Sequence, residues 1–305
     1  MNKSADKSTV VCFGEILWDI LPVAAKPGGA PMNVAYHLNK LGVDTKLVSR
    51  VGDDEAGEEL LNLLKGWGLS TVYCQQDREH TTSEVHVVVD ENNEVSYDIL
   101  YPVAWDYIAF KEELVPLLRN ANAFVFGSLI TRNHVSHQTL LKMLEISSYN
   151  VFDVNLRAPY YKKETVGQLL EQTNLLKLNQ AELELVTSWF SQDCTREAER
   201  IKLLQDRFQI KEIIVTKGSK GASYYTPFSR EDSVAFNIEV ADTVGSGDSF
   251  LAAFLAKRLE KEHPKVALSY ATALAAFVTM HHGACPDYNL NSLEDFKRNK
   301  ELQKL

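Results

Sequence analysis

The sequence is poor in the features that mark membrane, nucleic-acid-binding and disulfide-stabilised proteins. Its four cysteines show no CxxC spacing and predict reduced thiols, not a metal site or a disulfide framework. A net charge of −9 leaves no basic face for nucleic acid, so small molecules are the expected partners. No apolar run approaches the length of a bilayer span, and residues 1–10 lack the apolar core of a signal peptide. We therefore expect a cytoplasmic protein that binds neither nucleic acid nor membrane.

Two common nucleotide-binding motifs are missing as well. The sequence has no GxxxxGK[ST] motif, which excludes a P-loop enzyme. No GxGxxG motif follows a β-prone run, because Phe250 occupies the position that the third glycine would need. A dinucleotide-dependent dehydrogenase is therefore not expected. With 305 residues and no internal repeat or interdomain linker, the chain is long enough for one large α/β domain or two small ones.

The order of the apolar segments predicts an α/β fold with a mostly parallel sheet covered by helices on both faces. Short β-prone runs alternate with helical patterns, which is typical of βαβ units. The expected strands are 9–20, 43–52, 123–127, 150–154 and 175–178, and the expected helices include 54–68, 111–119, 135–147 and 163–171. Two alternating runs, 83–90 and 94–100, interrupt this order and predict a hairpin. Such a hairpin serves as a lid, as a dimer surface or as an edge extension of the main sheet.

Polar residues cluster where the expected strands end. Ligands of parallel sheets bind at the C-terminal ends of the strands, and this rule selects Asp153, Asn155, Arg157, Lys177, Asn179 and Glu182. Arg157 suits either a phosphate or sugar ligand or an ion pair with an acid. Near the N-terminus, Asp19 is either a turn residue or a ligand contact. Asn33 follows Gly28 and Gly29 in the first turn of a helix, where it caps the helix or binds a polar ligand together with the glycine amides.

The stretch DTVGSGDSFLAAF (242–254) carries the strongest chemical signal. A β-prone run at 233–240 predicts a strand before it, and the apolar spacing of 249–262 predicts a buried helix after it. The backbone N–H groups of Gly245, Ser246 and Gly247 would then face an anion at the positive end of the helix dipole. Asp248 is either an ordinary acid at a helix start or a general base beside a migrating phosphoryl group.

Two further turns contain glycine. In KEIIVTKGSKGASYY (211–225), a strand ends in Thr216, Lys217 and Gly218 and a second strand follows Gly221. This composition suits a phosphate site, although a plain hairpin also explains it. A helical pattern over 264–282 ends at Gly283.

Two of these motifs together resemble the signatures of the ribokinase-like, or PfkB-type, carbohydrate kinases. GGAPMNVAYHLNKLG (28–42) is similar to the first signature of the family and DTVGSGDSFLAAF to the second. The resemblance covers residues 9 to 300 and implies an ATP-dependent transfer of phosphate to a sugar hydroxymethyl group, with Mg²⁺. It also implies a single domain over 1–305, with a β lid formed by about 17–27 and 82–108.

The resemblance also implies roles for individual residues. It implies that Asp248 is the base and that the amides of 245–247 form the anion hole. It also implies that the sugar hydroxyls bind to Asp19, Gly28, Gly29 and Asn33, and that Arg157 belongs to the same sugar site. Asn179 and Glu182 match the tract that arranges Mg²⁺ through water. ATP contacts are implied for Lys177, Thr216, Lys217, Gly218, Gly221, Gly283 and Ala284, and a monovalent cation such as K⁺ for Asp242.

The identity of the sugar that accepts the phosphate depends on smaller sequence differences. PGGAP (27–31) and FDVNLR (152–157) are similar to fructokinases, which form fructose 6-phosphate, whereas the short segment between Asp19 and Gly28 and the residue Val154 depart from many relatives. Three alternatives stay open: 2-keto-3-deoxygluconate, whose carboxylate Arg157 would suit; ribose or a nucleoside; and a catalytically silent sensor. The lid hairpin also allows a homodimer through strand pairing.

Overall fold

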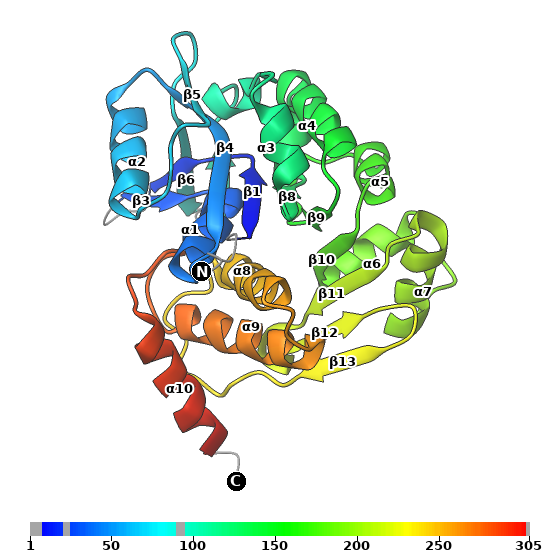
Figure 1. The fold of residues 1–305 in the computed structure, drawn as a ribbon. Helices are drawn as coiled ribbons and strands as arrows, with labels where there is room; N and C mark the ends of the chain where they lie inside the picture. The colour runs from blue at the N-terminus through cyan, green and yellow to red at the C-terminus, as the bar shows by residue number, and fades with distance from the viewer. Residues whose placement is uncertain (1–7, 21–24, 90–94, 303–305) are drawn as a thin grey trace, which may run out of the picture.

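The computed structural model describes residues 8–20, 25–89 and 95–302, and they form two β-sheets with surrounding helices (Figure 1). The large sheet has nine strands in the order β13-β12-β11-β10-β9-β8-β1-β4-β5. Its strands are β1 (Thr9–Phe13), β4 (Asp44–Gly52), β5 (Cys74–Asp77), β8 (Ala123–Gly127), β9 (Asn150–Asp153), β10 (Leu175–Asn179), β11 (Glu212–Thr216), β12 (Ala222–Tyr225) and β13 (Arg230–Ser233). All neighbours from β11 to β5 are parallel, whereas β12 and β13 join as an antiparallel edge. The predicted mostly parallel sheet is confirmed.

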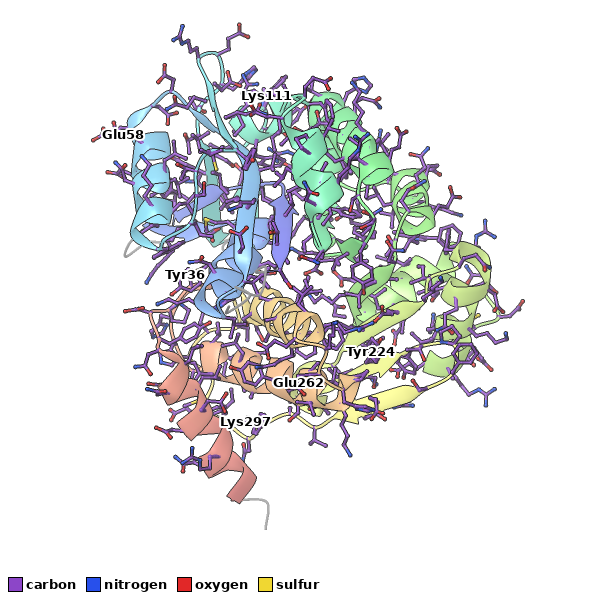
Figure 2. All side chains as sticks on the ribbon, viewed as in Figure 1. Tyr36, Glu58, Lys111, Tyr224, Glu262 and Lys297 are labelled. Carbon is purple, nitrogen blue, oxygen red and sulfur yellow. The ribbon has the colours of Figure 1, made fainter. Side chains whose placement is uncertain are left out.

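Both faces of the large sheet are buried, and β1 shows why. Val10 and Cys12 point into one hydrophobic cluster and Val11 and Phe13 into another, because successive side chains of a strand face opposite sides. The first cluster is covered by α1 (Ala30–Lys40), α2 (Glu55–Gly66), α8 (Ser246–Leu259), α9 (Pro264–Thr279) and α10 (Leu290–Leu302). The second is covered by α3 (Leu114–Asn120), α4 (His134–Ile146), α5 (Lys163–Glu171), α6 (Gln180–Ser188) and α7 (Glu197–Phe208). Figure 2 shows the contrast between the buried Tyr36 on α1 and the exposed Glu58 on α2.

The small sheet has four strands in the order β3-β2-β6-β7. They are β2 (Leu17–Ile20), β3 (Ala25–Gly28), β6 (Ser83–Val89) and β7 (Val95–Ile99). The predicted hairpin is the antiparallel pair β6 and β7, and its turn lies outside the described residues. Since β6 pairs with β2, in parallel, the hairpin does not extend the edge of the large sheet. The segments predicted for a lid, 17–27 and 82–108, thus contribute to one separate sheet, which leaves their function as a lid a prediction.

The bounds predicted for three elements around and after the 242–254 stretch are wrong. The strand predicted at 233–240 ends at Ser233, and residues 234–240 form an irregular segment in which Phe236 and Ile238 pack against α9 and its surroundings. The helix predicted over 249–262 begins earlier, at Ser246, and ends at Leu259. The helix predicted over 264–282 ends at Thr279 with Met280 as its C-cap, so Gly283 lies in the loop that follows. Gly283 does adopt a positive φ of 85°, which the glycine explains.

Candidate active site

The N-terminus of α8 is the structural centre of the candidate site. Gly245 caps the helix with φ 74°, and a methyl group added there would lie 2.5 Å from Cβ of Ala284, so the turn requires glycine. The amide of Ser246 donates to the carbonyl of Thr243 at 3.3 Å. A methyl group at Gly247 would lie 2.8 Å from Nζ of Lys177, which places that ammonium group directly beside the first turn. The helix dipole and the Lys177 charge therefore create a positive potential at the same point.

Asp248 lies in this first turn and is held from α1. Its Oδ2 accepts a hydrogen bond from Nδ2 of Asn33 at 2.8 Å, across 215 residues of sequence. Burial raises the pKa of the Asp248 carboxyl, whereas Lys177, the Asn33 amide and Arg157 counteract the rise. A carboxylate with a raised pKa is a better proton acceptor than an exposed one, so Asp248 suits general base catalysis.

The glycine pair before α1 brings Asp19 to the same region. Strands β2 and β3 pair so that Leu17 is opposite Gly28, and a methyl group at Gly28 would lie 2.3 Å from Oδ2 of Asp19. Gly29 caps α1 with φ 114°, and a side chain there would collide with the backbone of Glu15. Burial raises the pKa of Asp19 to about 6, with Arg157 acting against it and Asp242 adding to it. The structure thus brings together Asp19, Gly28, Gly29, Asn33 and Asp248. The exposed Arg157 lies close enough for its charge to lower the pKa of both Asp19 and Asp248.

Glu15 belongs to this cluster, and sequence reasoning missed it. Its side chain is 4% exposed, and Oε1 accepts a hydrogen bond from the amide of Ala30 at 3.2 Å. Oε2 is buried without a hydrogen-bond partner in the described part of the protein. Burial raises the pKa of Glu15 to about 7, and the Asp248 charge contributes. A charged residue inside the apolar run 9–20 is the signal that could have identified it, because buried acids need a structural or functional reason.

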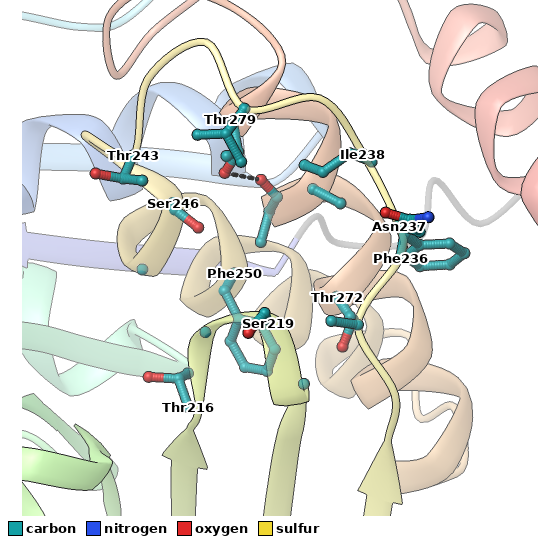
Figure 3. A pocket seen from close by; sticks show the side chains of 17 residues that line it. Thr216, Ser219, Phe236, Asn237, Ile238, Thr243, Ser246, Phe250, Thr272 and Thr279 are labelled. Atoms are coloured by element: carbon teal, nitrogen blue, oxygen red, sulfur yellow. Dashed lines mark hydrogen bonds between the residues drawn. The ribbon is translucent and has the colours of Figure 1, made fainter.

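A cavity of about 560 Å³ lies beside the N-terminus of α8, where Ser246 is part of its lining (Figure 3). Its apolar wall is formed by Phe236, Ile238 and Phe250 together with alanines of α9. Its polar lining comes from Thr216, Gly218, Gly221, Ser246, Gly247 and the hydroxyls of Thr272 and Thr279. The size and mixed lining suit a ligand with an apolar ring and a polar tail, and the tail would end at the α8 N-terminus. The alternating apolar residues of 233–240, which resemble a strand in sequence, therefore line a cavity instead.

Lys177 and its neighbours connect the strand ends to this helix. Nζ of Lys177 contacts both carboxylate oxygens of Asp153 at 2.7 and 2.9 Å, and both residues are buried. Burial opposes the Lys177 charge, but Asp153 and Asp248 outweigh it, and the Lys177 pKa is raised. Asn179 and Glu182 form a capping box on α6, and Glu182 also accepts the amide of Leu156 at 2.9 Å. The side chains of Asn179 and Glu182 therefore stabilise the start of α6.

Other predicted residues take positions away from the cavity lining. Nζ of Lys217 binds Oε1 of Glu197 at 2.7 Å and Oγ of Ser223 at 2.6 Å, whereas the adjacent Thr216 and Gly218 line the cavity. Asp242 accepts the amide of Gly283 at 2.9 Å and the amide of Val244 at 3.0 Å, which ties the loop at 283 to the start of the motif.

Two general observations complete the description. Across the described ranges, no three side chains of His, Cys, Asp or Glu are grouped so that they could hold a metal ion. No helix in the part of the chain that the structure describes is long and apolar enough to cross a membrane.

Comparisons with known proteins find similarity to carbohydrate kinases. The profile of the pfkB family carbohydrate kinases matches residues 9–290. Among curated proteins, the chain is 28% identical to "Probable fructokinase-4" of Arabidopsis thaliana over 312 residues, covering 93% of this chain and 94% of that protein. The fold is similar to that of a Xylella fastidiosa fructokinase with bound ATP, with a TM-score of 0.86, 20% identity and coverage of 97% and 99%. It is also similar to a Vibrio cholerae O395 fructokinase double mutant in fructose, ADP and potassium ion bound form, with a TM-score of 0.83, 24% identity and coverage of 95% and 98%.

Proposed function

Because the chain belongs to the pfkB family of carbohydrate kinases and is an ATP-dependent sugar kinase, we propose that its acceptor is D-fructose and its product fructose 6-phosphate. Fructokinases recur among its relatives, with 28–29% identity over more than nine tenths of the chain in the plant examples. The observation that carries the proposed mechanism is the hydrogen bond from Asn33 to Asp248 at the N-terminus of α8. In this proposal Asp248 is the base between the group around Asp19 and the cavity of about 560 Å³, whose lining includes the adjacent Gly247.

We assign the cavity to ATP. Its apolar wall suits the adenine ring, and Thr216, Gly218 and Gly221 lie where the ribose and phosphates would pass. The amides of 245–247 would receive the γ-phosphate, next to the Lys177 ammonium group. Preorganised positive groups of this kind stabilise the charge that develops during phosphoryl transfer. We assign Lys217, Gly283 and Ala284 to the borders of the nucleotide site, because Lys217 lies between Thr216 and Gly218 in the chain and Ala284 lies against Gly245.

The sugar lies on the opposite side of Asp248 in this proposal. Asp19, the backbone of Gly28 and Gly29, and Asn33 would bind its hydroxyls, and Arg157 would close the site from the strand ends. Asp248 would accept the proton of the attacking hydroxymethyl group while that oxygen is held in line with the γ-phosphate. Bringing both substrates together in this way replaces an encounter in solution by a positioned reaction.

We assign the ion sites from the carboxylate and amide oxygens that the candidate residues offer. Both oxygens of Glu182 already accept backbone N–H groups, so Glu182 and Asn179 would reach Mg²⁺ through water, as expected for an ion that keeps much of its hydration shell. When bound, Mg²⁺ neutralises charge on the nucleotide phosphates. Oδ2 of Asp242 accepts the amide of Gly283 and Oδ1 accepts the amide of Val244, and a monovalent cation there would share the carboxylate with backbone carbonyls.

A substrate panel and one substitution test the proposal. Coupled measurement of ADP release with ATP and Mg²⁺ compares fructose, ribose, 2-keto-3-deoxygluconate, glucose, mannose and adenosine, with and without K⁺. Fructose should exceed the others; a preference for another acceptor would overturn the sugar assignment, and sugar binding without ADP release would favour a sensor. Asp248→Asn should lower kcat at least about a hundredfold and preserve sugar binding. The exposed Glu55→Gln, in the first turn of α2, is the matched control.

A further inference from the structure

The loop 283–286 is fixed against one face of α1. The hydroxyl of Tyr36 donates to the carbonyl of Pro286 at 2.7 Å, and Nε2 of His37 lies 2.9 Å from the carbonyl of Ala284. Asn33, Tyr36 and His37 are three and four residues apart, so they share this face of the helix. The backbone on both sides of Cys285 is therefore held, and its side chain has a defined direction.

The Cys285 thiol points at the residue that holds the proposed base. Sγ of Cys285 lies 3.4 Å from Oδ1 of Asn33 and donates to it, and Nδ2 of the same amide donates to Oδ2 of Asp248 at 2.8 Å. We propose that Cys285 is a positioning residue that orients the Asn33 amide toward Asp248. This inference rests on the proposed function of Asp248 as the base.

The chemistry of the three groups supports this order of donors and acceptors. An amide has one acceptor oxygen and one donor nitrogen, so a donor on the Oδ1 side leaves Nδ2 facing the carboxylate. Burial raises the pKa of the Cys285 thiol, and the Asp248 charge raises it further, so the thiol keeps its proton at neutral pH and acts as a donor. If the donor at Oδ1 were lost, rotation of the amide would be less restricted and the hydrogen bond to Asp248 would weaken.

The proposal predicts an effect on turnover and on its pH dependence. Because Cys285→Ala removes one side-chain hydrogen bond to the Asn33 amide, it should lower kcat about three- to tenfold. The Asn33 amide holds the Asp248 pKa down, and weakening its bond should move the acidic limb of the kcat profile to higher pH. The other groups acting on Asp248 stay unchanged in this variant: Lys177 from β10, Asp153 from β9, Arg157 after β9 and Glu15 after β1.

Conservative replacement separates positioning from packing. Cys285→Ser keeps a donor and should retain most of the activity and the position of the acidic limb, whereas Cys285→Ala should not. Cys194→Ala, which removes a thiol whose Sγ contacts the carbonyl of Glu199 at 3.8 Å, is the matched control and should behave as the unaltered protein. Melting temperatures of all variants report any folding defect.

The outcomes distinguish this inference from the proposed function. Inactivity of Asp248→Asn combined with an unchanged pH profile and kcat in Cys285→Ala would overturn the role of Cys285 alone. Equal losses in Cys285→Ser and Cys285→Ala would overturn it as well, because a donor would then be irrelevant. Near-normal turnover of Asp248→Asn would remove the proposed base itself.

Discussion

Glu15 is a single buried acid that ties the Gly28-Gly29 turn to the pH dependence of stability. It binds the amide of Ala30, next to the Gly28-Gly29 pair, and one of its oxygens has no partner in the described chain. Burial raises its pKa from 4.5 to about 7. Between these two values the folded protein binds more protons than the unfolded chain, so this residue lowers the free energy of unfolding as pH rises. The loss is complete above the folded-state pKa.

We therefore predict a difference in pH dependence between the protein and its Glu15→Gln variant. Glutamine keeps an oxygen for Ala30 but cannot ionise. From pH 4.5 to 8, the free energy of unfolding of the unaltered protein should fall by up to about 3 kcal/mol more than that of the variant. Urea unfolding at several pH values measures this, with the exposed Glu164→Gln on α5 as the control. Parallel pH profiles for both proteins would show that Glu15 does not carry the raised pKa.

Residue chemistry also marks the limit of what could be predicted from the sequence. The sequence selects several residues as candidates: Asp248, Asn33, Asp19 and the glycines beside them. The structure does bring these residues together. The pairing of Lys177 with Asp153 could not be predicted, because both are merely polar residues near strand ends until β9 and β10 are known to be neighbours. Glu15 is marked in the sequence only as a charged residue inside an apolar run, and the position of Cys285 next to Asn33 could not be read from the sequence at all.

At the scale of elements, the start of α2 fastens the small sheet to the large one. Asp54 caps α2 by accepting the amide of Gly57 at 2.8 Å. The same carboxylate accepts the amide of Thr82 at 2.7 Å and its hydroxyl at 2.6 Å, immediately before β6 begins. One side chain therefore serves as a helix cap and as an anchor for the entry into the small sheet.

We predict that Asp54→Ala destabilises the protein by about 2 kcal/mol, at the upper end for a helix cap, because three hydrogen bonds to Asp54 are lost together. Asp53→Ala is the matched control, since the neighbouring Asp53 is exposed and contacts Arg78 only at 3.7 Å. Chemical denaturation measures both. Equal stability of the two variants would mean that the Asp54 hydrogen bonds contribute nothing net.

Helices and strands were predicted well where the apolar periodicity reflects packing in the core. They were predicted poorly where the apolar residues line the cavity. The helix over 163–171 and the strand 123–127 have the predicted bounds, because both are packed against the core in the regular way. The run 233–240 alternates like a strand, yet only its first residue belongs to β13. Phe236, Ile238 and Val240 line the cavity together with the intervening Ala235 and Asn237, so the alternation of apolar residues in this segment does not reflect a strand.

At the scale of the whole molecule, the residues proposed to bind the sugar come from both sheets. Asp19 lies on β2 and Gly28 ends β3, both in the small sheet, whereas Asp248 and Lys177 belong to the layers of the large sheet. A sugar bound between these groups contacts both sheets at once. Since β2 pairs directly with β6, and β6 with β7, any ordering of Asp19 is transmitted through backbone hydrogen bonds to the hairpin.

We predict that saturating fructose together with a non-hydrolysable ATP analogue slows amide hydrogen exchange in β6 and β7, as expected if the small sheet closes as a lid. Closure would exclude water from the γ-phosphate and so limit wasteful hydrolysis. The interior strand β8 of the large sheet, 123–127, is the internal control and should exchange equally with and without ligands, because its residues are buried already. Exchange measured by mass spectrometry separates these segments. Unchanged exchange in β6 and β7, with ligand binding verified by calorimetry on the same sample, would show that the small sheet is a fixed wall of the sugar site and that access is controlled elsewhere.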